Sequence, residues 1–293
     1  MRLLRPASAV TLAYASVEET DYPVWSSATT YAAGARAIKG HRIWVSSQGA
    51  NTNHDPETAG ASWWTDAGPT NQRAFLDDSL ATATTAAESL TVAVWAGRID
   101  AVSLLAADAE SATVTQIIGA EVVFARTVTL QTRAVRGWYD WFMQPFTARS
   151  EVVVRGLIPS ADALLIVTLS RPGGSVSLGL LRAGLSVWLG DTMAGVKLGL
   201  INYSLITTDG FGDTSFTPRG FASRNSYRLV MDRALARSAR KIFSEYRATP
   251  VVWIGDADDD DELLDYGIYN DFEIDLDAKD LAYCTLTIQG MRR

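Results

Sequence analysis

The sequence predicts a mainly β protein with one important helix, and three observations support this fold class. Between Leu90 and Asp209, short runs rich in Val, Leu, Ile and Thr are separated by Gly, Pro, Ser and Asp. A segment from Val24 to Trp64 combines many aromatic rings with short alternating runs, and only one stretch near the C-terminus has helical spacing. The expected parts are a three-stranded aromatic-rich module, an antiparallel, jelly-roll-like β-sandwich, and a small C-terminal α+β unit.

The length of 293 residues suggests about two domains, at roughly 150 residues each. Gly68 and Pro69 mark one boundary, and the expected division is residues 1–20 as an N-terminal strand or arm, 21–68 as the module, 69–209 as the sandwich and 210–293 as the C-terminal unit. Hydrophobic residues make up 47% of the chain and charged residues 20%, as in globular proteins. The net charge of −7 argues against a nucleic-acid-binding surface.

The N-terminus resembles a signal peptide only superficially. Pro6, Ser8 and Thr11 interrupt its apolar region, and the residues from Val10 to Tyr14 alternate as in a strand. We therefore expect a strand here and no secretion by a signal peptide. No apolar stretch approaches 18 residues without a charge or a glycine, so no membrane span is expected.

The sandwich is expected to contain eight strands, because β-rich runs recur at short intervals and suit antiparallel pairing. The expected strands are 91–96, 99–105, 112–118, 121–130, 151–157, 163–169, 177–181 and 196–205. The glycines from Gly173 to Gly199 match no nucleotide-binding fingerprint and are interpreted as turn glycines between these strands.

The aromatic module holds more ring surface than so small a core needs, so some rings are expected to face outward and to stack on sugar rings. The candidate carbohydrate-binding residues are Trp25, Tyr31, Trp44, Trp63 and Trp64. Within the module, the runs 35–39 and 42–47 predict a hairpin that turns at Gly40 and His41. The alternative is that Trp25, Trp44 and Trp64 simply form the core of a small domain.

The order of these residues resembles the small chitin- and cellulose-binding modules of carbohydrate-binding types 5 and 12. In these modules an opening Trp, here Trp25, is followed by a Tyr-x-x-Gly turn, here Tyr31 with Gly34, and by an aromatic on the central hairpin, here Trp44. An Asn, a Pro and a closing Trp then follow, and these are Asn51 or Asn53, Pro56, and Trp63 or Trp64. Trp44 departs from the more usual Tyr, and Arg36 replaces a residue that is more often acidic or polar. The resemblance implies a compact three-stranded unit that binds sugar.

A second aromatic cluster, G-W-Y-D-W-F at residues 137–142, falls in a long connection between two strands. It is interpreted either as a plug at one end of the sandwich or as a contact patch, and both are favoured over a sugar site. Since Trp and Tyr dominate protein interfaces, the candidate interface residues are Trp138, Tyr139, Trp141 and Phe142.

The residues from Ser226 to Tyr246 are expected to form one amphipathic helix, because apolar residues recur at three- and four-residue spacing while basic residues take the other faces. Pro250 then ends the helical segment, and Val251–Ile254 is expected as a strand. The helix is predicted to pack a stripe against that strand and against 272–276, the stripe being Val230, Ala234, Leu235 and Ile242.

Enzymatic and metal-binding signals are weak. The acidic run Asp256–Glu262 fails the EF-hand spacing, so a solvated loop is expected there, although its sequence leaves open a pairing with the basic helix or with another subunit. His41 and His54 are the only histidines, and no nucleophile elbow occurs. One cysteine, Cys284, excludes an internal disulfide and is expected to be buried. We expect no enzyme, cofactor or dedicated metal site, with bound calcium at the acidic run left open.

The chain as a whole resembles structural proteins of the tail tip and baseplate of tailed bacteriophages. The similarity lies in the order of several motifs: G-P-T-N-Q-R-A-F-L-D after the module, V-x-L-G-x-L-x-x-G at 176–184, I-N-Y-S at 201–204, T-P-V-V-W-I-G at 249–255 and the segment from Y-G-I-Y-N-D-F-E-I-D through C-T-L-T-I-Q-G.

This resemblance implies a non-enzymatic virion part, assembled in the host cytoplasm, that links tail proteins and is present in multiple copies. Its module is expected either to contact host-surface glycan or to serve as a spacer or docking domain. The alternatives are a free-standing, lectin-like carbohydrate-binding protein and a non-catalytic accessory to a polysaccharide-degrading enzyme. A tail part should assemble with ring or trimer symmetry, whereas a lectin-like protein should bind glycan as a monomer or dimer.

Overall fold

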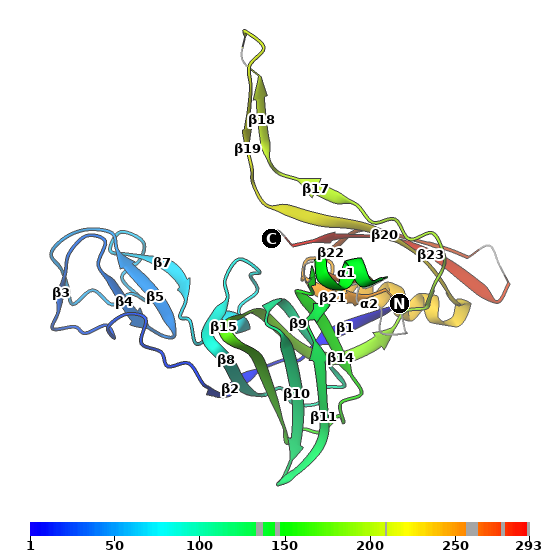
Figure 1. Cartoon of the computed structure of the whole chain (residues 1–293), viewed down its shortest axis with the longest axis horizontal. Helices are drawn as coiled ribbons and strands as arrows, with labels where there is room; N and C mark the ends of the chain where they lie inside the picture. Colours follow the sequence, from blue (N-terminus) through cyan, green and yellow to red (C-terminus); the bar gives the residue numbers. More distant parts are fainter. Residues whose placement is uncertain (133–136, 144–146, 209, 256–262, 277–278, 292–293) are drawn as a thin grey trace.

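The computed structural model (Figure 1) describes residues 1–132, 137–143, 147–208, 210–255, 263–276 and 279–291. The fold is mainly β with antiparallel sheets and little helix, which confirms the predicted class. Within these ranges, fourteen strands join in one sheet, and three smaller two-stranded sheets and one three-stranded sheet lie outside it.

The strand β1 (Arg2–Pro6) lies in the middle of the large sheet and links its two halves. It pairs on one side with β15 (Ala163–Trp188) and on the other with β21 (Val251–Ile254). Leu3 and Leu4 point to opposite faces and are both buried, so this short strand contributes to two different clusters of the core. The first residues of the chain therefore hold the body and the C-terminal unit together.

The body, which corresponds to the predicted sandwich, is built on the very long strand β15. Around it lie β2 (Thr11–Ala15), β8 (Thr84–Trp95), β9 (Ala101–Asp108), β10 (Ser111–Ile118), β11 (Glu121–Thr129) and β14 (Glu151–Arg155), with the short 3-10 helix η1 (Ala74–Leu76) against β15. Alternating residues of these strands enclose an apolar core of Val, Leu and Ala with Phe75. The strand predicted from the alternation at residues 10–14 is confirmed as β2.

Two of the eight predicted strands are one strand. The runs at 163–169 and 177–181 both belong to β15, in which the pairing with β8 shifts register between Ser170 and Ser175. The interpretation of the glycines as turn residues is accordingly wrong for those inside β15. At Gly184 a Cβ atom would collide with the carbonyl oxygen of Arg5 on β1, so this glycine allows two strands to approach closely.

The aromatic module extends to one side of the body (Figure 1) and contains two small sheets. β4 (Arg36–Lys39), β5 (Arg42–Ser46) and β7 (Trp64–Pro69) form a three-stranded sheet, and β3 (Thr30–Tyr31) pairs with β6 (Asn51–Thr52). The predicted hairpin is confirmed: Gly40 and His41 connect β4 to β5 with φ angles of 59° and 62°. Two successive positive φ angles are typical of the two-residue turn whose twist matches a hairpin.

The C-terminal unit places one helix against a twisted sheet. Its strands are β20 (Phe221–Asp232), β21, β22 (Leu264–Asp275) and β23 (Leu281–Gly290), and β20 also pairs with the short strands β16 (Asp191–Thr192) and β17 (Leu200–Asn202). The helix α2 (Ala236–Glu245) follows the 3-10 turn η2 (Arg233–Leu235) and packs through Ala236, Ala239 and Phe243. Phe243 stacks on Trp253 and Phe272, as the prediction that the helix folds back on the strands 251–254 and 272–276 requires.

The predicted helix at Ser226–Tyr246 is wrong over its first half. Residues 221–232 form β20, so Val230 lies in a strand, and Ala234 is exposed beside the only partly buried Leu235. The apolar residues of this stretch fit both periods, since Tyr227, Leu229 and Met231 also alternate. Pairing with β23 selects the two-residue period of a strand. The buried residues of β23 also alternate and complete the same apolar face in antiparallel register; they are Ala282, Cys284, Leu286 and Ile288.

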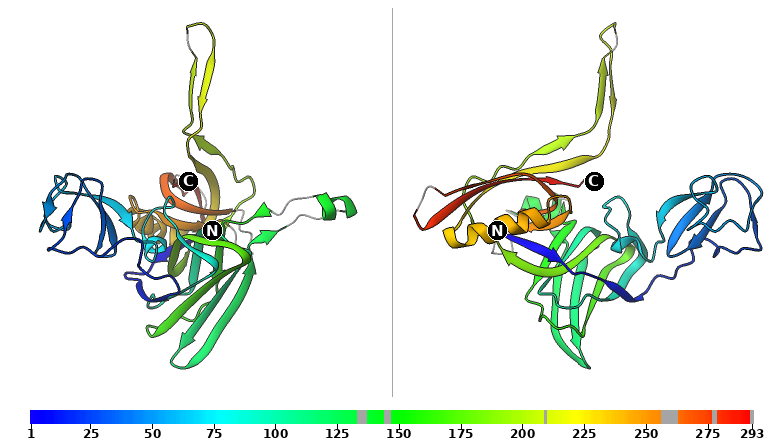
Figure 2. Two further views of the ribbon diagram at one scale, coloured as in Figure 1. Left: turned by 60° about the vertical axis from the view of Figure 1, so that its left-hand side comes forward. Right: turned by 180° about the vertical axis from the view of Figure 1, so that it is seen from behind.

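Two extensions leave the compact part of the chain. One consists of β12 (Gln131–Thr132) and β13 (Thr147–Ala148) and has the six-residue helix α1 (Trp138–Met143) at its end, which the left view of Figure 2 shows projecting from the body. The other is the hairpin of β18 (Leu205–Thr208) and β19 (Thr214–Thr217), which stands away from the sheet in Figure 1. The single strand predicted at 196–205 is therefore wrong: the pairing there is divided among an isolated bridge at Lys197, the strand 200–202 and the start of the hairpin.

Cys284 lies on the buried face of β23, as expected, and burial raises the pKa of its thiol to about 11. The thiol is therefore almost entirely protonated near neutral pH. Among the described residues, no helix is both long enough and apolar enough to cross a membrane.

Candidate functional site

Two of the five candidate sugar-stacking rings form the core of the aromatic module. Tyr31 is buried and Trp64 is only 1% exposed, and their rings meet edge to face with centres 5.0 Å apart. The indole N–H of Trp64 donates a 2.8 Å hydrogen bond to the carbonyl oxygen of His54. A sugar therefore cannot stack on either ring while the module is folded.

The other three candidate rings, Trp25, Trp44 and Trp63, are half-buried and pack around this core. The Lys39 ammonium lies 4.3 Å from the centre of the Trp25 ring, and the Trp44 N–H donates to the Lys39 carbonyl oxygen at 3.1 Å. The ring of Trp63 stacks on the His54 imidazole, with centres 3.4 Å apart and planes 12° from parallel. One face of Trp25 and one face of Trp63 are thus already covered by other side chains. The ring surface left for stacking on a sugar is therefore smaller than the five candidate residues would give if all of them faced outward.

A polar junction lies at the base of the module. The Glu19 carboxylate accepts hydrogen bonds from the Thr70 hydroxyl at 2.6 Å and from His41 Nδ1 at 3.0 Å. Partial burial acts to raise the pKa of Glu19, but these two hydrogen bonds, together with the nearby charges of His41 and Arg73, outweigh it and the net pKa is lowered. The carboxylate is therefore ionised near neutral pH and joins the linker before the module to the strand end after it.

The four candidate interface residues all lie on α1 and are strongly exposed. The exposed fractions are 84% for Trp138, 75% for Tyr139, 57% for Trp141 and 76% for Phe142, with Met143 at 66%. We call these five residues the aromatic tip. The interpretation of this segment as a plug in the sandwich is wrong, because the tip stands at the end of an arm (Figure 2).

The aromatic tip has the properties of a docking surface. A helix of so few residues gains little stability by itself, and apolar side chains gathered on it in water lose the stabilisation that burial gives. Clustered apolar exposure on a folded protein marks an interaction site much more often than isolated exposed residues do. The structure thus gathers the predicted anchor residues into one projecting group, and its position on an arm was not predictable from the sequence.

The β18–β19 hairpin is a second exposed apolar surface, and sequence reasoning missed it. Its exposed side chains include Leu205, Ile206, Phe211 and Phe216. Thr207 and Ser215 lie directly opposite each other and are joined by a 2.6 Å hydrogen bond between hydroxyl groups, which supports the strand pairing. The available signal was the pattern of β-branched residues flanking G-F-G-D, which is typical of a hairpin.

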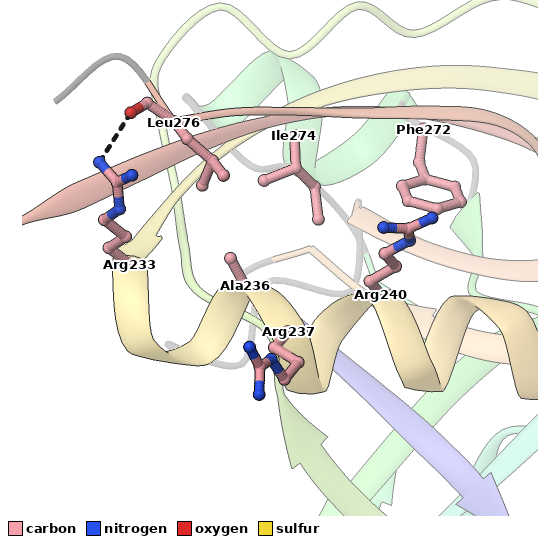
Figure 3. Close-up of a pocket in the computed structure, with 7 residues that line it drawn as sticks. All are labelled: Arg233, Ala236, Arg237, Arg240, Phe272, Ile274 and Leu276. Atoms are coloured by element: carbon pink, nitrogen blue, oxygen red, sulfur yellow. Dashed lines mark hydrogen bonds between the residues drawn. The ribbon is translucent and has the colours of Figure 1, made fainter.

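A groove between α2 and the end of β22 is the third surface (Figure 3). It encloses about 460 Å³. The helix side contributes Arg233, Ala236, Arg237 and Arg240, and the strand side contributes Phe272, Ile274 and Leu276. The floor is apolar, and every titratable group that lines the groove is an arginine. The sequence indicated both the basic face of this helix and the apolar alternation of Phe272, Ile274 and Leu276, but not the open groove between them.

A buried polar cluster around Asp265 is structural in character. The Asp265 carboxylate is 3% exposed and accepts hydrogen bonds from Ser223, Asn225 and Tyr227, the last at 2.6 Å. Burial, followed by the nearby Asp265 charge, raises the pKa of the Tyr227 hydroxyl well above its usual range. The hydrogen bonds satisfy the carboxylate and connect β20 with β22, so the cluster stabilises the sheet.

Potential metal ligands do not gather in the described part of the chain. No cluster of three or more His, Cys, Asp or Glu side chains occurs among the described residues. The acidic run Asp256–Glu262, with the calcium site that was left open there, lies outside them. His41 and His54 contact Glu19 and Asn51 respectively, both within or at the base of the aromatic module.

No protein-family model matches the chain, and no curated protein matches it significantly.

Proposed function

We propose that the chain is a structural subunit of a multi-protein assembly and that it docks to its neighbours through the aromatic tip. The observation that carries this proposal is the projecting position of five large, exposed apolar side chains on α1. Partner proteins commonly bind such anchors, because a few Trp, Tyr and Phe residues supply most of the affinity of an interface.

The order of motifs that resembles tail-tip and baseplate proteins makes a phage tail the assembly we favour. In that setting the chain is a virion component that links tail proteins in several copies, and its body has the jelly-roll-like sandwich expected from the sequence. The division into arm, module, sandwich and C-terminal unit is part of the same proposal. The two projecting extensions suit such a role, since each reaches beyond the body toward neighbouring chains.

Replacing both tryptophans of the tip, Trp138→Ser with Trp141→Ser, is expected to weaken assembly at least tenfold, corresponding to about 1.4 kcal/mol. The chain would be purified alone and after co-expression with the products of neighbouring genes, and complexes measured by sedimentation velocity. The control is Val122→Ser, which also replaces an exposed apolar residue but lies on β11. A wild-type chain that stays monomeric in both preparations, or a double variant that assembles normally, would contradict the proposal.

A second candidate function is glycan binding by the aromatic module, favoured by the half-exposed rings of Trp25, Trp44 and Trp63. If it is correct, the chain should sediment with insoluble chitin or cellulose, and Trp63→Ala should reduce the bound fraction about tenfold, because the open ring face is lost. The control is Val24→Ala, which changes an exposed apolar residue of the same module that has no ring. Equal binding by both variants, or none by the wild type, would remove this candidate.

A further inference from the structure

We propose that the groove between α2 and β22 binds an extended peptide segment of a partner protein, which adds a strand to the open edge of β22. The residues of this segment that face α2 are apolar or acidic, and those that face the opposite side are basic. The inference goes beyond the proposed function, because it uses a surface other than the aromatic tip and names the chemistry of what binds there.

β22 has an open edge over most of its length. β21 pairs with it only from Leu264 to Gly267, whereas β23 pairs with it as far as Asp275. Among the described residues, no other strand pairs with β22, so its residues from 268 to 275 have a strand on one side only. At such an edge, alternate residues direct their N–H and C=O groups away from the sheet, and an extended chain can pair with them.

The groove lies along this open edge and not on the side of β23. Phe272 and Ile274 occupy the same rows of the sheet as Leu286 and Cys284 of β23 and face the same side. The two β23 residues are at most 1% exposed, whereas Phe272 and Ile274 are half-buried and Leu276 is 45% exposed. The cover that α2 gives to this face therefore ends above β22. In agreement, the described residues that line the groove come from β22 and from residues 233–240 (Figure 3).

The floor of the groove suits the apolar side chains of an added strand. Phe272, Ile274 and Leu276 alternate along β22 and so face the same side, toward Ala236 (Figure 3). The side chains of an added strand have the same two-residue period, so every second residue of the segment meets this floor. The volume of about 460 Å³ lies in the range of pockets that hold a small organic ligand, which leaves room for roughly two aliphatic side chains.

The helix side of the groove attracts an anionic group. Arg233 Nη1 donates a 2.9 Å hydrogen bond to the carbonyl oxygen of Leu276, so this guanidinium already has a partner. Among the described residues, neither Arg237 nor Arg240 forms an ion pair, and Figure 3 shows the Arg240 side chain reaching toward the Phe272 ring. A carboxylate of the bound segment can therefore pair with these two arginines beside the apolar floor.

The opposite face of β22 is acidic. Asp271 and Glu273 alternate with the floor residues and are exposed, and neither forms an ion pair in the described part of the chain. Basic side chains on this face of an added strand would lie beside them, because directly opposite residues of paired strands are roughly 5 Å apart. Charge thus determines which face of the segment is basic and which is apolar or acidic.

The same charges argue against other occupants. Two β22 edges paired with each other would bring Asp271 and Glu273 against the same carboxylates of a second copy. Like charges on directly opposite residues destabilise strand pairing, and charged side chains on an edge commonly prevent self-association. The carboxylates would also repel the phosphate groups of a nucleic acid or of an anionic lipid surface. A peptide with the complementary alternation satisfies both faces and the open backbone groups.

Fluorescence anisotropy with a labelled peptide tests the contact on the full-length chain. The probe T-L-K-E-K-V-T has its apolar and acidic residues at one set of alternate positions and its lysines at the other. The control peptide T-K-K-L-V-E-T has the same composition but mixes basic and apolar residues on both faces. We expect the chain to bind the probe at least tenfold more tightly, because only the probe matches both faces of β22. Equal affinities, or no binding of the probe, overturn the proposal.

N-methylated probes test whether the peptide pairs as a strand. In an extended chain, alternate N–H groups point to the same edge, so only one set can donate to β22. One probe carries N-methyl groups on both lysines, and the other carries them on leucine, glutamate and valine. We expect one of the two to lose at least tenfold in affinity and the other to bind like the parent probe. Equal binding or equal loss by both overturns strand addition.

Arginine variants of the chain test the helix side of the groove. Arg237→Glu combined with Arg240→Glu should weaken binding of the probe at least tenfold, since the glutamate of the probe then meets like charges. The control pair, Arg98→Glu with Arg219→Glu, makes the same change of net charge at exposed positions outside the groove and should leave binding nearly unchanged. Equal effects of the two pairs overturn the site. Circular dichroism verifies that each variant is folded.

A charge exchange tests the opposite face. Asp271→Lys combined with Glu273→Lys should weaken binding of the probe and strengthen binding of T-L-E-E-E-V-T, in which glutamates replace both lysines. This exchange of preference requires the two faces of the peptide to lie as proposed. A variant that keeps the preference of the wild type overturns the assignment of the basic face.

The proposed function and this inference fail separately. The tip variant Trp138→Ser with Trp141→Ser should bind the probe like the wild type. If that variant loses assembly and the wild type does not prefer the probe, the tip function stands and the strand addition is wrong. If phosphatidylcholine–phosphatidylglycerol vesicles bind the chain through Arg237 and Arg240 while the probe does not bind, a lipid surface is the occupant and the strand addition is overturned.

Discussion

Replacing Gly184 with valine is expected to destabilise the whole large sheet, with a loss of at least about 3 kcal/mol in the free energy of unfolding. A Cβ atom at this position would meet the carbonyl oxygen of Arg5 and the Cα of Pro6, both of which are backbone atoms of β1. β1 cannot move aside freely, because it also pairs with β21 on its other edge. The strain therefore reaches both halves of the fold.

Chemical denaturation followed by tryptophan fluorescence measures this effect. Gly49→Val is the matched control, since a Cβ atom at Gly49 meets nothing within 4 Å and its backbone angle is not in the left-handed region. The control should unfold at nearly the wild-type denaturant concentration. A Gly184→Val chain with the same midpoint as the wild type would mean that β1 and β15 do not approach as closely as described.

The second large effect is expected for Phe243→Asp on α2, with a loss of more than about 4 kcal/mol. Phe243 is fully buried, and its ring lies among those of Trp253, Tyr269 and Phe272. The substitution removes this aromatic packing and places a carboxylate among buried rings, where its desolvation is costly. Phe243 is a better position for this test than Leu235, which belongs to the stripe that the sequence predicted to be packed. Leu235 is only partly buried.

Limited proteolysis with mass spectrometry reads out where the Phe243→Asp chain opens. New cleavage is expected within residues 236–290, while the aromatic module stays resistant because its core of Tyr31, Ala37 and Trp64 is separate. Ser244→Asp, which puts the same charge on the exposed neighbouring position, should leave the cleavage pattern unchanged. Cleavage confined to the module, or protection equal to the wild type, would show that α2 is not packed on the sheet as described.

The candidate surfaces were only partly predictable. The sequence indicated which aromatic clusters are candidates for binding, but only the structure shows which rings are buried and which are exposed. Trp64 completes a core, while Trp138 is exposed at the end of an arm. A ring has the same hydrophobicity in both places, so its role depends on which other side chains surround it. The groove depends on Phe272 and Arg240, which are about thirty residues apart in sequence and meet only because the helix folds back on β22.

The local features of this protein could be predicted from the sequence alone. They are its β-rich character, the hairpin that turns at Gly40 and His41, and strands such as β10, for which the alternation of neighbouring residues is enough to predict a strand. The tertiary structure alone decided that residues 221–232 are a strand, because their apolar residues fit two periods and only pairing with β23 selects one. It also decided that β1 joins β15 to β21, two strands far apart along the chain. Such long-range pairing depends on the combined burial of distant residues, which no local pattern contains.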